Sequence, residues 1–481
     1  MATPIPANDA RFSVAEVVQA TGGQVLSQGN RLCRGVTTDS RAAVDGKLFV
    51  ALNGESFDGH DFVGAVVERG AAGVLVSRDV DAPADAFVVR VESTLHALGA
   101  LARWHRQRWG GRVVAIGGSA GKTTTRAAVS SLLEAVWPGA VHYARGNLNN
   151  QVGVPMVLLG AEPQHRIAVV EVGTNAPGEV ASLAGVCQPD LALLTLVALE
   201  HTEGLGTLDD IEAEEGELLA VLGAAGIAVA NGDDPRAVRR LQCSEATTKL
   251  TYGSGPTCDY RLLERTLLDL EKMRLVVERP TNRGRGRIAV ECGTVGLPGA
   301  LAVLAALAVA DRLTGIPVDA ELATRAFCHE GAFESGRLCP VLCQDGTVVI
   351  DDTYNANPAS VRSSVDTACE IARARSARLV LVIGEMRELG ACSAREHAAI
   401  GQLIAQTEAA MLIGVSGDAS HVVSAAGNAG QDAVFCPDAE AALGTALERV
   451  RPGDVVLVKA SRGVRAERVV SGLCDARGAT A

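Results

Sequence analysis

Residues 113–125, VVAIGGSAGKTTT, decide the fold of this chain. The run at 112–116, apolar after Arg112, predicts a buried strand. Five small residues, 117–121, then turn the chain, and Lys122 opens an amphipathic helix that reaches about Val136. A strand, a glycine turn and a helix start form a cradle for phosphate. Backbone N–H groups can approach the oxygens there, and the helix N-terminus carries partial positive charge.

The residues that follow the glycines indicate that the phosphate belongs to a nucleotide. Lys122 would reach the β- and γ-phosphates, and the hydroxyl of Thr123 would hold Mg²⁺. The spacing departs from the strict G-x-x-x-x-G-K-[ST] motif, because residue 116 is Ile and the usable glycines are Gly118 and Gly121. A plain glycine turn before a helix is the alternative, but Lys-Thr-Thr directly after the glycines favours a phosphate site.

Composition restricts the classes of partner. The 481 residues are enough for about three domains. Apolar residues make up 48% and aromatic residues only 3%, so the cores must be built from Ala, Val and Leu. The formal net charge of −12 argues against sequence-independent binding to nucleic acid or to an anionic membrane.

Cysteine usage and hydropathy favour a cytoplasmic protein. The twelve cysteines are scattered and form no C-x-x-C pair, which predicts reduced, buried thiols. The first 30 residues carry no apolar signal core, and no uninterrupted apolar run reaches the ~18 residues that span a bilayer. We therefore expect no membrane insertion.

The order of strands and helices predicts an α/β protein with domains at 1–110, 111–325 and 326–481. The first domain combines a helix at 12–20, short strands and a helix at 93–109 that ends at Gly110-Gly111. In the second, strands near 112–116, 166–172, 191–197, 226–230 and 249–252 alternate with helices. That rhythm predicts a mostly parallel, doubly wound sheet with ligands at the carboxyl ends of the strands. The third domain repeats the alternation without a phosphate loop.

Polar residues stand at three of these strand ends. Glu171 follows IAVV, His201 follows LALLTLVALE, and residues 351–358 read DDTYNANP. A carboxylate and an imidazole beside a phosphate loop suit a divalent cation. Taken singly, Glu171 and His201 could be helix caps or loop residues, but their shared position favours the cation site.

Two further stretches predict structure more than function. Residues 279–287, RPTNRGRGR, are typical of a solvated hairpin loop, with RNA contact as the alternative. The helix expected at 298–313 is apolar nearly all round and should be buried.

Eleven short stretches in a fixed order then resemble one family. They are 38–41, 57–62, 118–125, 146–150, 171–179, 201–206, 231–235, 336–337, 352–358, 384–390 and 459–467. Together they resemble the Mur ligases over nearly the full length of the chain, and within them the members that add D-alanyl-D-alanine.

This resemblance implies a three-domain architecture. The first domain would be a small α/β unit, the second a P-loop sheet and the third a Rossmann-like α/β unit. The first would hold a UDP-N-acetylmuramoyl-tripeptide, the second ATP with Mg²⁺, and the third would close over both and help bind D-alanyl-D-alanine. We expect a monomer.

The resemblance also implies roles for individual residues. The nucleotide would lie on Gly118, Ser119, Ala120, Gly121, Lys122, Thr123 and Thr124, with Arg337 and Asp352 from the third domain. The catalytic residues would be Lys122, Glu171 and His201, and the metal site would comprise Thr123, Glu171, His201 and Glu215. The substrates would lie against Ser40, Arg41, Asn147, Asn149, Asn150, Tyr354, Asn355 and Asn357.

Three departures from the family pattern stand out. Glu215 occupies the place of a lysine that the family carbamylates to make a metal-binding anion; a solvated helix residue in an acidic run is the alternative for Glu215. The family's HNxxN stretch, which helps hold adenine, is replaced by an apolar stretch at 298–304. Gly117, Glu385 and Ala460 are milder replacements of Thr, Asp and Gly.

Two other functions remain open at this point. One is a divergent Mur-type ligase that joins another amino acid or peptide. The other is a nucleotide- or UDP-sugar-binding scaffold without catalysis. Glu215 and the missing HNxxN stretch favour the scaffold, whereas the intact Lys122, Thr123 and Glu171 oppose it.

Overall fold

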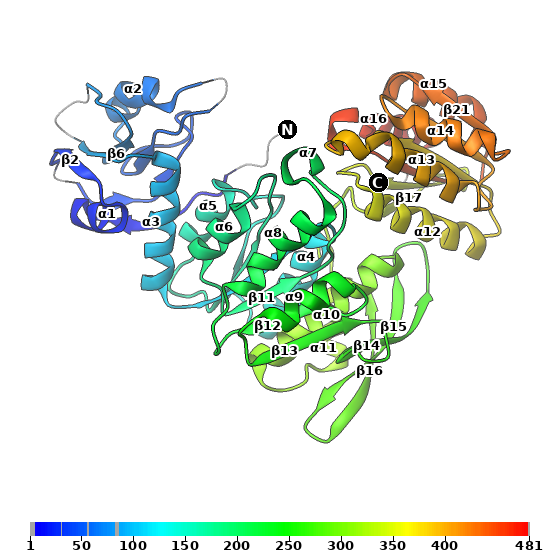
Figure 1. Cartoon of the computed structure of the whole chain (residues 1–481), viewed down its shortest axis with the longest axis horizontal. Coiled ribbons are helices and arrows are strands. Elements are labelled where there is room, and N and C mark those ends of the chain that lie inside the picture. The colour runs from blue at the N-terminus through cyan, green and yellow to red at the C-terminus, as the bar shows by residue number, and fades with distance from the viewer. Residues whose placement is uncertain (1–4, 30, 55–56, 82–85, 480–481) are drawn as a thin grey trace.

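Three bodies, each built on its own sheet, follow one another along the chain in the computed structural model, which describes residues 5–29, 31–54, 57–81 and 86–479 (Figure 1). The sheets have five, nine and six strands among the described residues, and a two-stranded ribbon accompanies the first. The α/β class and the mostly parallel pairing predicted from the sequence are confirmed.

The first body is a five-stranded sheet in the order β2-β7-β6-β5-β4. Its first helix starts one residue after Ser13, which forms a capping box with Glu16. The predicted strands are shorter than expected, and β2 and β7 were not predicted. The elements are β1 (Arg11–Phe12), α1 (Val14–Thr21), β2 (Gln24–Ser27), β3 (Cys33–Arg34), β4 (Val36–Thr37), β5 (Leu48–Val50), η1 (Gly59–Phe62), α2 (Val63–Glu68), β6 (Gly73–Val76), β7 (Phe87–Arg90) and α3 (Thr94–Trp109).

The central body is a nine-stranded sheet covered by helices on both faces. Successive strand residues alternate between two cores: Val113 and Ala115 pack with α5, α6 and α8, whereas Val114 and Ile116 pack with α4, α10 and α11. Its elements are β8 (Arg112–Gly117), α4 (Lys122–Val136), β9 (Val141–Tyr143), α5 (Gly153–Leu159), β10 (Ile167–Glu171), α6 (Glu179–Cys187), β11 (Leu191–Leu194), α7 (Thr202–Leu205), α8 (Leu208–Ala220), β12 (Ile227–Asn231), α9 (Pro235–Cys243), β13 (Thr248–Gly253), β14 (Tyr260–Leu267), β15 (Met273–Thr281), β16 (Gly284–Cys292), α10 (Gly296–Thr314) and α11 (Ala320–Cys328).

The strand order of this sheet opens a crevice beside the phosphate loop. The order is β16-β15-β14-β13-β12-β11-β8-β10-β9. The chain leaves β8 to one side for β9 and β10 and then crosses to the other side for β11. Ligands of open α/β sheets bind where the strand order reverses in this way.

The basic stretch at 279–287 is the end of an antiparallel hairpin, as predicted: β15 ends at Thr281 and β16 begins at Gly284. β15 and β16 pair in register from Met273 and Cys292 to Thr281 and Gly284, and the hairpin extends away from the rest of the body in Figure 1. The expectation of full solvation is wrong for Arg279, because its guanidinium is buried and forms an ion pair with Asp311 at 3.0 Å. The positive charge of Arg279 therefore neutralises a buried carboxylate inside the body.

The apolar helix predicted at 298–313 is confirmed as α10 and lies in the core of the central body. Among the described residues, α10 is the one helix long and apolar enough to cross a bilayer, and 78% of that window is buried within the protein. A core helix passes such a test on length and composition.

The third body is a six-stranded sheet in the order β17-β18-β22-β19-β20-β21. The last helix starts at Glu467 and not near Gly463, because a 3-10 turn and the left-handed Arg465, with φ of 61°, come first. The elements are β17 (Cys339–Leu342), β18 (Val348–Asp352), α12 (Pro358–Ala374), β19 (Leu379–Gly384), η2 (Gly390–Cys392), α13 (Ser393–Ile404), β20 (Met411–Val415), α14 (Ala419–Asn428), β21 (Ala433–Cys436), α15 (Ala439–Arg449), β22 (Val455–Lys459), η3 (Arg462–Val464) and α16 (Glu467–Arg477).

Helix α3 joins the first two bodies into one core. Its buried residues Leu98, Leu101 and Ala102 belong to a single hydrophobic cluster that also holds Leu75 of the first sheet and Val170 of the central sheet. The third body has two core clusters, on the two faces of its sheet, and Val295 of the central body joins one of them. Neither cluster includes a side chain of the first sheet.

Candidate functional site

The phosphate loop is shaped by close packing against the strand beside it. The hydroxyl of Thr195, after β11, donates to the carbonyls of Gly117 at 3.0 Å and Ala120 at 2.7 Å. Gly118 has φ of 118°, and a Cβ there would lie 2.3 Å from the Thr195 hydroxyl. Glycine is required at this position both for the backbone conformation and for the approach of Thr195.

Lys122 lies folded over the loop at the start of α4. Its ammonium donates to the carbonyl of Gly118 at 2.5 Å and lies 3.6 Å from a carboxylate oxygen of Glu200. Burial lowers the pKa of Lys122, but Glu200, Glu215 and Glu171 together outweigh burial and raise the pKa above its usual value. Lys122 is therefore a fixed positive charge at the place where phosphates would lie.

Glu171, at the end of β10, is buried and held from two sides. One carboxylate oxygen accepts from the Thr123 hydroxyl and the other from the Asn149 amide, each at 2.9 Å. The guanidinium of Arg126, which forms an ion pair with Glu334, lies 3.6 Å from the same carboxylate. The sequence predicted the meeting of Thr123 and Glu171 but gave no indication of Arg126.

The side chains of Thr123 and Glu171 suit Mg²⁺ better than a metal ion that is coordinated entirely by protein ligands. No three His, Cys, Asp or Glu side chains converge on a metal geometry in the part of the chain that the structure describes. Mg²⁺ keeps several waters and uses one or two carboxylates together with substrate phosphates. The adjoining hydroxyl of Thr123 and carboxylate of Glu171 fit that requirement. His201 and Lys122 both approach the carboxyl of Glu200.

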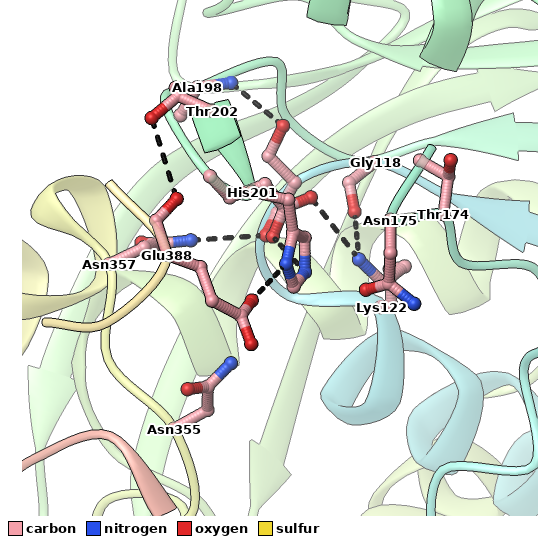
Figure 2. Close-up of polar contacts among 12 residues, drawn as sticks. Gly118, Lys122, Thr174, Asn175, Ala198, His201, Thr202, Asn355, Asn357 and Glu388 are labelled. Carbon is pink, nitrogen blue, oxygen red and sulfur yellow. Dashed lines mark hydrogen bonds and ion pairs between the residues drawn. The ribbon is translucent and has the colours of Figure 1, made fainter. Parts of the chain in front are cut away.

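His201 stands at the boundary with the third body (Figure 2). Its backbone is left-handed, with φ of 49°, and caps the short helix α7. Its Nε2 lies 3.9 Å from Glu200, and its Nδ1 is hydrogen-bonded to the carboxylate of Glu388. Burial lowers the pKa of His201 against the raising effect of Glu388, so a neutral imidazole is favoured.

Two carboxyl groups lie buried behind Lys122. Glu215 has no exposed surface, and its Oε2 accepts the N–H of Gly118 at 2.8 Å. The alternative that Glu215 is a solvated helix residue is therefore wrong. Burial raises the pKa of Glu215, and it raises that of Glu200 to about 8 against the lowering effect of Lys122. Glu200 was not singled out from the sequence, although its position before His201 at a strand end was a usable signal.

The third body approaches the loop through the predicted turn after β18. Asn357 caps α12, and its amide also donates to the carbonyl of Ser119 at 3.2 Å. Lys459, at the end of β22, is buried and pairs with Asp352 at 2.8 Å. Arg337 stacks over the ring of Tyr354 at 4.1 Å.

A cavity of about 510 Å³ lies between the central and third bodies. It gathers most of the predicted residues: Ser119, Ala120, Gly121, Lys122, Thr123, Thr124, Asn147, Asn149, Asn150, Glu171, His201, Arg337, Asp352, Tyr354, Asn355 and Asn357. Ser40 and Arg41, in the first body, do not line it, and Glu215 lies behind the loop. Gly118 supplies backbone beneath it.

One wall of the cavity is apolar. It is formed at the start of α10 by Val295, Leu297, Pro298, Leu301 and Ala302. Asn231 and Tyr252, at the ends of β12 and β13, also face the cavity and were not predicted to do so.

Comparisons with known proteins cover nearly the whole chain. Three family models match in chain order: the Mur ligase family catalytic domain at 33–106, the Mur ligase middle domain at 116–310 and the Mur ligase glutamate ligase domain at 336–462. A UDP-N-acetylmuramoyl-tripeptide–D-alanyl-D-alanine ligase of Escherichia coli (strain K12) is 32% identical, with 91% of this chain and 93% of the relative covered. One of Bacillus subtilis (strain 168) is 29% identical, with 96% and 98% covered.

Solved structures of MurF proteins are also similar to this chain along nearly its full length. A crystal structure of MurF from Acinetobacter baumannii has a TM-score of 0.85 at 27% identity, covering 98% of this chain and all of that one. MurF of Thermotoga maritima in complex with ADP has a TM-score of 0.78 at 27% identity, covering 91% and 96%. With all three domain models in order and similarity along nearly the full length, the chain belongs to the Mur ligase family.

Proposed function

We propose that this chain is an ATP-dependent ligase that adds D-alanyl-D-alanine to a UDP-N-acetylmuramoyl-tripeptide, in the synthesis of peptidoglycan precursors. The observation that carries the proposal is the single cleft in which the phosphate loop, Glu171 and His201 face Asn357 and Arg337 of the third body. Relatives that bear this activity in their names match more than nine-tenths of the chain. The ADP complex of a MurF supports the use of ATP.

The three bodies would divide the substrates among them. Residues 1–110 would hold the UDP-sugar, with Ser40 and Arg41 on the uridine side. Residues 111–325 would hold ATP, and residues 326–481 would close over both ligands. We expect the protein to work as a monomer in the cytoplasm.

The reaction would run in two steps. The terminal carboxylate of the tripeptide attacks the γ-phosphorus of ATP, which forms an acyl phosphate and releases ADP. The amine of D-alanyl-D-alanine then attacks the acyl carbon, the bond to the phosphate oxygen breaks, and inorganic phosphate leaves. Little covalent work falls to the protein, so catalysis rests on positioning and charge neutralisation.

Each group in the cleft would serve one of those needs. Lys122 would hold the β- and γ-phosphates, and the loop 118–124 would supply backbone N–H groups. Mg²⁺ held by Thr123, Glu171 and His201 would neutralise the charge that develops on the phosphoryl oxygens. Glu215 would add a negative charge beneath Lys122 without the reaction with CO₂ that a lysine needs.

The remaining residues would orient the substrates. The floor of the cleft would be Asn147, Asn149 and Asn150. Arg337 and Asp352 would contact the nucleotide from the third body, whose closing face would carry Tyr354, Asn355 and Asn357. The apolar wall at the start of α10 would pack against the nucleobase in place of the family's asparagines.

Release of phosphate by the purified protein tests the proposal. The assay contains ATP, Mg²⁺, UDP-N-acetylmuramoyl-tripeptide and D-alanyl-D-alanine, and each component is omitted in turn. Release that requires all four is the expected result. Release that requires a different amine would make the chain a divergent Mur-type ligase, and nucleotide binding without release would make it a scaffold.

A further inference from the structure

A loop of the third body, residues 385–392, docks directly on the short helix that carries His201 (Figure 2). The carbonyl of Glu388 accepts from the hydroxyl of Thr202 and from the N–H of Glu203, both at 3.4 Å. Cys392 lies 3.5 Å from the same Thr202 hydroxyl. The main chain of this loop is thereby set against α7 of the central body.

The side chain of Glu388 then reaches past the helix to the imidazole of His201. Its carboxylate accepts a hydrogen bond from Nδ1 of His201. Both residues have left-handed backbones, with φ of 66° for Glu388 and 49° for His201. Non-glycine residues adopt that conformation rarely and keep it where the surroundings hold it, often at functional sites. Here the two unusual conformations face each other across the boundary between bodies.

We propose that Glu388 is a positioning residue that orients His201 and makes docking of the third body part of the cation site. A carboxylate accepts only from an Nδ1 that carries the proton, so Glu388 selects that tautomer and leaves the lone pair on Nε2. Nε2 is the nitrogen on the side of Glu200 and Lys122. The inference rests on the proposed function, because it takes His201 as a ligand of the cation.

The same contact makes docking and cation binding mutually dependent. The third body touches the central body at two points near Lys122: Asn357 donates to the Ser119 carbonyl, and the Glu388 carboxylate contacts His201. If docking orients the imidazole and so strengthens cation binding, then the bound cation must strengthen docking by the same factor. Glu388 thus couples docking of the third body to the orientation of Nε2 of His201.

Glu388→Gln tests the inference, with Glu203→Gln as the matched control. The Glu388 side chain is 56% exposed, so its replacement does not open a core. Glu203 is exposed in the same contact and carries the same charge, but it has no part in the His201 hydrogen bond. Binding of Mn²⁺ in the presence of ADP is followed from the free Mn²⁺ resonance, and the dimensions of the ligand-free full chain are measured by small-angle scattering.

We expect Glu388→Gln to weaken Mn²⁺ binding by about 10-fold or more, which is typical of the loss of a residue that orients a metal ligand. We also expect a larger radius of gyration without ligands, and neither effect in Glu203→Gln. In a His201→Ala background, Glu388→Gln should cause no further loss of Mn²⁺ binding.

The failures of the two proposals are distinguishable. If His201→Ala weakens Mn²⁺ binding and Glu388→Gln does not, the positioning role is wrong and the cation site stands. If His201→Ala itself leaves Mn²⁺ binding unchanged, the cation site of the proposed function is wrong and the coupling through Glu388 is wrong with it. An equal effect of Glu203→Gln would show that loss of any negative charge at this contact weakens Mn²⁺ binding. That result would also overturn the inference.

Discussion

Charges at the phosphate loop are set by one buried lysine among three acids. Lys122 is held between the loop carbonyl of Gly118 and the carboxyl of Glu200, with Glu215 and Glu171 close enough to raise its pKa. The loop that surrounds this ammonium consists of small residues and supplies no second cation. Loss of the charge should therefore appear in the chemical step and not in the fold.

Lys122→Ala should reduce turnover by roughly 10²–10³, since removal of a group that stabilises transition-state charge typically has that effect. Phosphate release measures the rate, and thermal unfolding checks the fold. Lys249→Ala is the matched control, because Lys249 is an exposed lysine that does not line the cavity. Near-normal turnover of Lys122→Ala would refute its role at the phosphates.

Glu215→Gln should lower the rate by about 10-fold or more and raise the Mg²⁺ requirement, because a charge beneath the loop is removed at nearly constant shape. The Gln amide oxygen can still accept the N–H of Gly118, so the loop should keep its conformation. Added bicarbonate should neither rescue the variant nor stimulate the parent, since Glu215 needs no CO₂ to be an anion. Unaltered rate and Mg²⁺ dependence would show that Glu215 has no such role.

Residue roles were predictable where the chemistry is local and not where it spans two bodies. The order of small residues, Lys122 and Thr123 predicted the loop, and Glu171 at a strand end predicted its neighbour. Nothing near Glu388 in the sequence indicates His201 as its partner, because the two are brought together only by docking of the third sheet. Arg126 was hidden in the same way, since its partner Glu334 comes from the segment that enters the third body.

At the scale of elements, β9 and α5 contain the titratable group with the clearest consequence for stability. His142, on β9, is partly buried and its Nε2 lies 2.7 Å from the carbonyl of Val157 on α5. Burial lowers the pKa of His142 to about 4, below its usual 6.5. The unfolded chain therefore takes up a proton at His142 at a higher pH than the folded chain does.

The sign of the effect follows from that difference. Stability from His142 is complete above about pH 6.5 and is lost as the pH falls from about 6.5 to about 4, by up to about 3 kcal/mol. His142→Gln should flatten the pH dependence of the free energy of unfolding over this range, measured by urea titration. His96→Gln, at an exposed position on α3, is the control. A parent chain whose stability does not fall in this range would contradict the assignment.

Elements were predictable where hydrophobic periodicity was strong. The central strands β8, β10, β11 and β12 lie within a residue or two of their predicted ends, apart from the carboxyl end of β11. β14, β15 and β16 were missed, because their outer faces carry charged residues such as Glu264 and Arg274, and only the pairing of these three antiparallel strands buries the other face. The start of α16 was misplaced because the left-handed Arg465 interrupts the chain after η3.

At the scale of the whole molecule, the first and central bodies share one hydrophobic core. Helix α3 places Leu98 and Leu101 in one cluster with both the first and the central sheets. The clusters of the third body include no side chain of the first sheet, although Val295 of the central body joins one of them. The first two bodies should therefore respond together to loss of a core side chain.

Leu101→Ala should destabilise the first and central bodies by about 2–5 kcal/mol, the usual effect of a buried Leu→Ala change. Hydrogen exchange should show faster opening in β6 and β10 alike and no change in β19. Leu381→Ala, at an equally buried leucine of β19, should give the opposite pattern. Opening of the first sheet without the central sheet would refute the shared core.

The position of β22 has a consequence for how the chain is made. β22 is the last strand in the chain, yet it lies in the middle of the third sheet, between β18 and β19. On the ribosome, the two earlier sheets have all their strands before the third sheet begins, but the third sheet stays split until its final segment emerges. Translation that stops early would leave β18 and β19 with unpaired edges, ready to pair with other chains. Completion of the third sheet therefore depends on synthesis of the segment that carries β22.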